Sequence, residues 1–96
     1  MATEQAFQIE TIELGDVRTN VLSGTITQRM HDPNEPGSDS WSGQLRVEDA
    51  GELTEGATSV VARTSGGERL EGRGVVVSIL GEIVILQGSG ELTIEL

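Results

Sequence analysis

Hydrophobic and polar residues alternate with a period of two along most of this chain, which is the pattern of half-buried β-strands. The clearest case runs from Trp41 to Glu48, where apolar residues or glycine occupy every second position and polar residues lie between them. Segments at about 7–14, 19–30, 58–64, 69–80, 82–87 and 91–96 also have strand character, and turn-forming residues separate them. No segment has a sustained helical period. The pattern predicts an all-β fold, a small antiparallel β-barrel or sandwich of about six to seven short strands, in one domain spanning residues 1–96.

The same alternation predicts which side chains face the core. In the first segment the apolar positions change parity between Ile9 and Ile12, which predicts a bulge near Glu10 and Thr11. In the second segment one face is expected to carry Leu22, Gly24, Ile26, Gln28 and Met30. Across the whole chain we expect a core that includes Leu45, Val47, Val76, Ile85 and Ile94.

The C-terminal third is the most apolar part of the chain. The runs 75–80 and 83–86 carry apolar residues at consecutive positions, so both of their faces should be covered, by barrel closure or by another chain. Gly81 and Glu82 predict a two-residue turn between the runs, and 88–90 leads into a last alternating segment. We therefore expect a C-terminal three-stranded meander, with the inward positions of its last strand filled by Leu92, Ile94 and Leu96.

Residues 31–40 contain both prolines of the chain together with Gly, Asn, Asp and Ser, and they predict a mobile loop. Asp32, Asn34 and Gly37 match three positions of an EF-hand calcium loop. However, Gly43 falls where that motif requires a bidentate Glu, and no helices are predicted on either side, so an EF-hand is excluded. A solvated acidic loop is the favoured interpretation, and a weak divalent site remains its alternative, formed by Asp32, Glu35 and Asp39.

The composition excludes several kinds of chemistry. The chain has no Cys, and all six of its basic residues are Arg, so disulfides, thiol catalysis, zinc–thiolate sites and a lysine-containing P-loop are absent. His31 is the only conventional general base, and no serine lies in a nucleophile-elbow pattern. The acidic pairs 48–49 and 52–55 flank turns, where solvated carboxylates are the usual case. We expect no enzyme, with no catalytic residue, no cofactor and no metal site.

The formal net charge is −10, from 16 acidic and 6 basic residues. This balance opposes direct binding to nucleic acid or to anionic membranes. Residues 1–5 contain no basic region or apolar run of a signal peptide, and no segment approaches the roughly 20 apolar residues of a membrane helix. We therefore expect a cytoplasmic protein. Around the 66–67 turn, Arg63, Arg69 and Arg73 are expected to pair with Glu68 and Glu71.

Three hypotheses about function follow. The first is a non-enzymatic β-barrel module that binds protein or assembles as a homo-oligomer, in analogy with accessory or virion-type structural proteins. Its candidate interface residues are Trp41, Val75, Val77, Ile79, Leu92 and Ile94, with a core position as the favoured alternative for Trp41. The alternative is an acidic inhibitor, an immunity protein or a nucleic-acid mimic, which would need carboxylates on one continuous face. The third and least supported is a small enzyme or metal-binding protein that uses His31 and the acidic loop.

Overall fold

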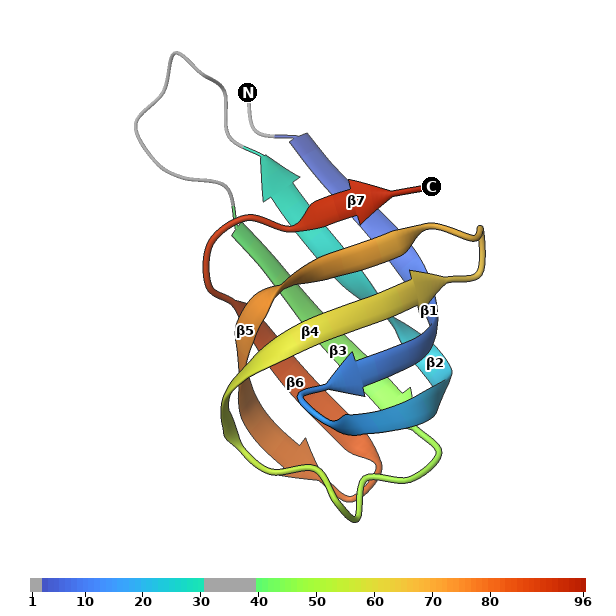
Figure 1. Cartoon of the computed structure of the whole chain (residues 1–96), viewed down its shortest axis with the longest axis vertical. Helices are drawn as coiled ribbons and strands as arrows, with labels where there is room; N and C mark the ends of the chain where they lie inside the picture. Colours follow the sequence, from blue (N-terminus) through green and yellow to red (C-terminus); the bar gives the residue numbers. More distant parts are fainter. Residues whose placement is uncertain (1–2, 31–39) are drawn as a thin grey trace.

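The computed structural model describes residues 3–30 and 40–96 (Figure 1). In this part of the chain all regular secondary structure is β-strand, which confirms the all-β prediction. The strands are β1 (Thr3–Leu14), β2 (Val17–Met30), β3 (Ser40–Val47), β4 (Gly56–Thr64), β5 (Arg69–Leu80), β6 (Ile83–Gly88) and β7 (Thr93–Glu95). The predicted loop at 31–40 lies almost entirely outside the described residues.

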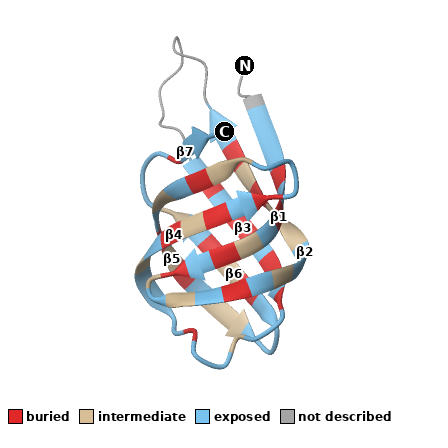
Figure 2. Ribbon diagram, turned by 45° about the vertical axis from the view of Figure 1, so that its right-hand side comes forward, coloured by how far each residue is buried: buried red, intermediate tan, exposed pale blue. Residues whose placement is uncertain are grey.

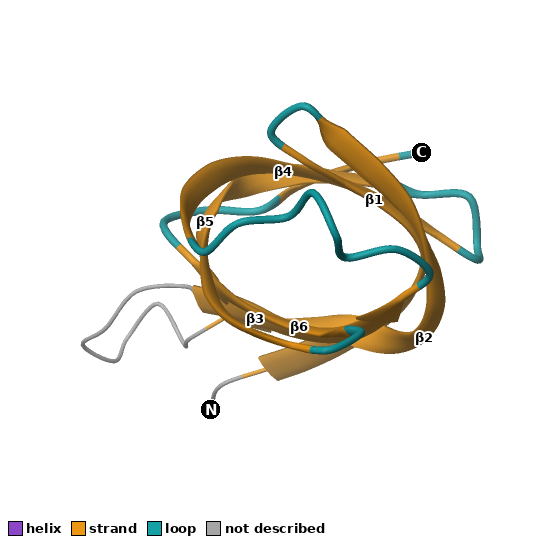
Figure 3. Cartoon of the chain, turned by 90° about the horizontal axis from the view of Figure 1, so that it is seen from below, coloured by secondary structure: helices purple, strands orange, loops and turns teal. Residues whose placement is uncertain are grey.

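Six strands close into an antiparallel barrel in the order β4-β1-β2-β3-β6-β5, and pairing of β5 with β4 completes the ring. The view along the barrel shows this closure directly (Figure 3). The short strand β7 lies outside the ring and pairs with the beginning of β5, where Leu70 is opposite Ile94. The sequence predicted either a barrel or a sandwich, and the structure is a barrel.

The predicted C-terminal meander is only partly correct. β5 and β6 form the expected hairpin, with Gly81 at a φ of 63° in the turn. The last strand, however, pairs with β5 and not with β6. β5 has 12 residues and β6 only 6, so the first half of β5 keeps an open edge after β6 has ended. β7 fills part of that edge.

The core lies inside the barrel, and buried residues alternate with exposed ones along the strands (Figure 2). Leu45, Val47 and Val76 are buried as predicted. The prediction was wrong for Ile85, which lies half-buried on the outer side, and for Ile94, which is 39% exposed. β6 is apolar on both sides, so alternation could not identify its inner face, and β7 has only three residues and pairs along one edge.

Bulges explain the other differences. The predicted bulge in β1 is confirmed, because the register with β2 shifts between Gln8 and Thr11. Two further bulges were missed, at Leu22 in β2 and at Val77 in β5, where the register with the neighbouring strand skips one residue. An extra residue reverses the side to which all following side chains point. Leu22 is therefore 55% exposed, and Ile79, a candidate interface residue like Val77, packs against the core instead.

Candidate functional site

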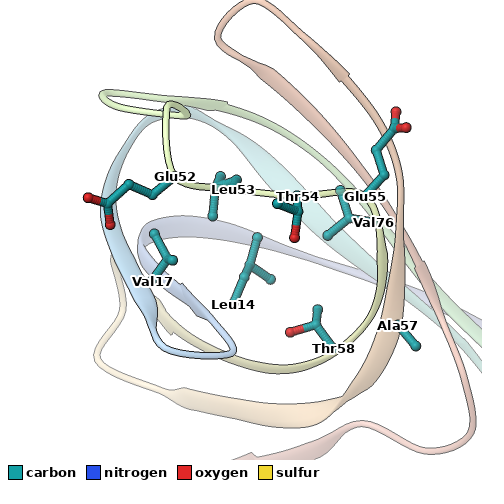
Figure 4. Close-up of a pocket in the computed structure, with 9 residues that line it drawn as sticks. All are labelled: Leu14, Val17, Glu52, Leu53, Thr54, Glu55, Ala57, Thr58 and Val76. Atoms are coloured by element: carbon teal, nitrogen blue, oxygen red, sulfur yellow. The ribbon is translucent and has the colours of Figure 1, made fainter.

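One end of the barrel is closed by the connection between β3 and β4, which crosses its mouth (Figure 3). Leu53 of this connection is buried and points into the barrel beside Leu14 and Val17 (Figure 4). The cavity that remains there is about 80 Å³, which is far below the roughly 300–1,000 Å³ of ordinary ligand pockets. Glu52 and Glu55 point away from each other and from the cavity (Figure 4). They form no carboxylate dyad, and Leu53 serves as an apolar plug.

Three connections that carry acidic residues lie at this end, because the β1–β2 turn borders the same cavity as Leu53 and the Val47 N–H bonds the carbonyl of Glu82 in the β5–β6 turn. Several are held locally: Glu82 accepts a hydrogen bond from Arg46 Nε at 3.0 Å, Glu48 accepts one from Asn20 Nδ2 at 3.0 Å, and Asp49 accepts the backbone N–H of Gly51 at 2.9 Å. The acidic residues of the three connections are Asp16, Glu48, Asp49, Glu52, Glu55 and Glu82. Within residues 3–30 and 40–96, no three His, Asp or Glu side chains converge into a metal-binding group. This end is a carboxylate-rich surface without the geometry of a metal site.

Two other predicted sites lie outside the described residues. One is His31, the only candidate general base. The other is the divalent-ion alternative in the loop, formed by Asp32, Glu35 and Asp39.

The arginines near the β4–β5 turn form a surface network. Arg69 Nη1 lies 2.5 Å from Glu71 Oε2 and 3.6 Å from Glu95 Oε2, so the predicted pairing with Glu71 is confirmed. Glu68 instead bonds Thr64, accepting the hydroxyl and donating its own N–H to the Thr64 oxygen, both at 3.0 Å. Arg69, with Arg18 and Arg63, lines a depression of about 240 Å³ that also contains Glu13. Exposed ion pairs of this kind contribute about 0–1 kcal/mol each and mark no reactive group.

Two of the six candidate interface residues are removed from the surface by the fold. Trp41 is 2% exposed and Leu92 is also buried, so both are core residues. For Trp41 this confirms the core position that was the alternative to an interface position. The indole of Trp41 lies against the backbone of β5 and β6, where side chains are missing at Gly72, Gly74 and Gly88. Those three glycines make room for the largest side chain of the core.

Val75 and Val77 lie on the outer side of the barrel, and Val77 is 53% exposed. Val77 borders a shallow depression of about 420 Å³ over β2, β3, β6 and β5. The strand registers place the outward side chains of this region beside one another in rows: Gln44 pairs with Thr25 and Ile85, and Ser42 pairs with Thr27 and Gln87. We call this surface the neutral face; it consists of Thr25, Thr27, Ser42, Gln44, Val75, Val77, Ile85 and Gln87.

The neutral face carries no charged side chain, although the chain has a net charge of −10. Each of its two ends is bordered by one acidic and one basic residue. These are Arg46 and Glu82, an ion pair, at one end, and the cross-strand neighbours Glu4 and Arg29 at the other. Sequence reasoning missed most of this surface, because Ser, Thr and Gln on single strands give no signal until the register brings them together. The two valines were the part that could be found.

In the part of the chain that the structure describes, no helix has the length and hydropathy needed to cross a membrane. Comparisons with protein-family models, with curated proteins and with solved structures find no match to this chain. The neutral face is therefore the candidate functional site on the basis of its geometry and chemistry alone.

Proposed function

We propose that this protein is a non-enzymatic β-barrel module that associates with further copies of itself through the neutral face, in a structural or accessory role. The observation that carries the proposal is one outer surface of four strands that lacks charge in a chain with 16 acidic residues. Uncharged surfaces with exposed apolar side chains are typical of protein contacts, and charged residues are depleted at the centres of interfaces.

The charge pattern favours a second copy as the partner. In a two-fold symmetric contact the same patch occurs on both subunits, so a charged patch would face its own charge. Two chains of net charge −10 repel each other over most of their surface. On the neutral face, hydroxyl and amide groups of Thr, Ser and Gln can both donate and accept hydrogen bonds, and the face therefore complements itself.

The exposed valine provides the apolar part of the contact. The bulge at Val77 pushes this side chain out of the sheet, beside the depression over β3 and β6. In a two-fold arrangement, Val77 of each copy can enter the depression of the other. Complete burial of a side chain of this size contributes about 1.5–3 kcal/mol. The proposal takes the protein to act in the cytoplasm, as the sequence predicts, with neither nucleic acid nor a membrane as a direct partner.

The substitution Val77→Glu tests this proposal. In a two-fold contact each subunit would contribute one new carboxylate to the same interface. Like charges across an interface cost several kcal/mol, so the association constant should fall at least about 100-fold. Light scattering after size-exclusion chromatography should give a lower mass for this variant than for the wild type at equal concentration. The position is exposed, so the free energy of unfolding should change by less than about 0.5 kcal/mol.

Leu96→Glu is the matched control, because it adds the same charge at a fully exposed leucine beyond β7. Its mass should equal that of the wild type. Equal masses for the wild type and Val77→Glu, or an equal loss in both variants, would contradict association through the neutral face.

A second candidate function is supported by the acid-rich end of the barrel. Three connections that carry acidic residues lie there, and an inhibitor of a basic protein or a nucleic-acid mimic would require carboxylates on one such surface. Such a protein needs no contact with its own copies. A wild-type chain that remains monomeric, and whose affinity for a basic partner falls when Glu52 and Glu55 are both replaced by Gln, would favour this function over self-association.

A further inference from the structure

Among the described residues, one long strand edge of the barrel has no partner. β1 pairs with β2 from Thr3 onward, but its pairing with β4 begins only at Ile9. The first part of β1, from Thr3 to Gln8, therefore has a neighbour on one side only among the described residues. With β2 and the start of β3, it extends beyond the closed ring toward the N-terminus (Figure 1). Unpaired edges of this kind accept an additional strand.

The hydrogen-bonding groups on this edge that have no partner within residues 3–30 and 40–96 belong to Glu4 and Ala6. The carbonyl of Gln8 points away from β2, because it accepts the N–H of Ser65 at 3.0 Å. Backbone groups alternate in direction along a strand, and the register from Thr3 to Gln8 is continuous. Glu4 and Ala6 have the same parity as Gln8, so their N–H and C=O groups also point away from β2. No backbone bond to these groups occurs in the described part of the chain.

We infer that β1 of a second copy adds to this edge, antiparallel and about a two-fold axis at Gln5. In this register Glu4 of each copy lies opposite Ala6 of the other, and each such pair exchanges both of its N–H···O bonds. This pairing rests on the proposed function in one respect, that copies of this chain associate with one another. It places a second contact on a different part of the molecule.

The other registers centred on residues 4–7 are less favourable. An axis at Glu4 places Glu4 of one copy opposite Glu4 of the other. An axis at Phe7 places Glu4 of one copy opposite Glu10 of the other. Both arrangements bring like charges together and are destabilising. An axis at Ala6 requires the backbone groups of Gln8, whose carbonyl already accepts the Ser65 N–H. The axis at Gln5 uses only free groups and opposes no like charges.

The open edge is also nearly neutral and continuous with the neutral face. Glu4 is the only charged residue in the stretch 3–8, and its cross-strand neighbour is Arg29. On the outer side, Ala6 lies beside Thr27 and Gln8 beside Thr25. Pairing of two edges would therefore join the neutral faces of two copies into one sheet surface. This continuity, together with the register, identifies a second copy rather than an unrelated peptide as the occupant.

Cysteine cross-linking tests the register, because the chain has no cysteine of its own. On the proposed axis, position 5 faces itself as a non-hydrogen-bonded antiparallel pair, with Cα atoms about 4.5 Å apart, within the range for a disulfide. Gln5→Cys should therefore form, on mild oxidation, a disulfide-linked dimer of twice the 10.2 kDa mass, seen on a non-reducing gel. Glu10→Cys is the control: it is also exposed on β1 but lies beyond the proposed pairing, and it should cross-link at least about tenfold more slowly.

Ala6→Pro supplies a second test. The Ala6 N–H faces the open edge, so proline removes a donor that the barrel does not use, and proline is tolerated at such edge positions. Cross-linking of Gln5→Cys should slow at least about tenfold in the Ala6→Pro background, with the barrel intact by circular dichroism. Equal cross-linking of Gln5→Cys and Glu10→Cys, or no effect of Ala6→Pro, would overturn the inference. The cross-linking experiment and the mass measurement on Val77→Glu are independent of each other. If Gln5→Cys cross-links specifically but Val77→Glu has the same mass as the wild type, association through the neutral face is refuted and the edge contact is not.

Discussion

Replacing Gly88 with alanine tests how the core accommodates Trp41. A Cβ atom at Gly88 would lie 2.3 Å from Trp41 Nε1 and 2.4 Å from two ring carbons. The backbone there has little freedom to move, because Gly88 is paired with Gly74 and the next residue, Ser89, donates its N–H to the Arg73 carbonyl at 2.8 Å. The indole is 2% exposed and is enclosed on its other sides. Either the indole or strand β6 must shift.

The expected magnitude follows from two opposing effects. Overpacking of a core costs about 1–3 kcal/mol, and this contact is close enough to place the loss near the upper end. Replacing glycine by alanine also restricts the unfolded chain, which stabilises the fold by about 0.4–1 kcal/mol where the backbone conformation permits. Gly88 has no positive φ, so this gain applies. The net loss should be about 2 kcal/mol in the wild type.

Urea denaturation of a double-mutant cycle with Trp41→Leu measures the effect. Without the indole the contact disappears, so Gly88→Ala should stabilise the Trp41→Leu protein by about 0.4–1 kcal/mol. Gly74→Ala is a useful comparison, because its Cβ would also lie 2.8 Å from the Gln87 carbonyl oxygen and should remain destabilising in both backgrounds. A Gly88→Ala protein as stable as the wild type, or equally destabilised with and without Trp41, would refute the proposed packing.

Two further predictions concern the ends and the surface of the barrel. Leu53→Ala should lower the free energy of unfolding in urea by about 2–3 kcal/mol, because it removes the buried side chain at the end of the barrel. The neighbouring Glu52→Ala should change this free energy by less than about 0.5 kcal/mol. Equal effects of the two substitutions would show that the connection does not close the barrel. The urea midpoint should rise between about 0.05 and 1 M NaCl, because salt screens the repulsion within a chain of net charge −10; a midpoint that falls with added NaCl would contradict this.

The sequence was most informative where one strand face is apolar and the other polar. The segment from Trp41 to Val47 shows this alternation at every residue, and its predicted inner face is confirmed by the structure. The turns at 66–67 and 81–82 were equally clear, because glycine marks both of them and supplies the positive φ at Gly67 and Gly81. Local patterns of this kind depend only on nearby residues.

Features that depend on pairing between distant segments could not be predicted. The bulges at Leu22 and Val77 arise from the match to a neighbouring strand, and each reverses the direction of the residues that follow. The return of β7 to β5 depends on the unequal lengths of β5 and β6. The neutral face has the same origin, because it joins residues of four strands. Only the register shows that the uncharged positions are neighbours.

Sedimentation equilibrium of the wild-type chain over a range of micromolar concentrations tests the central claim most directly. Association through the neutral face predicts a weight-average mass that rises above 10.2 kDa as the concentration increases. It also predicts tighter association at high salt, where repulsion between two chains of net charge −10 is screened. A mass of 10.2 kDa at every concentration and at both low and high salt would contradict the account.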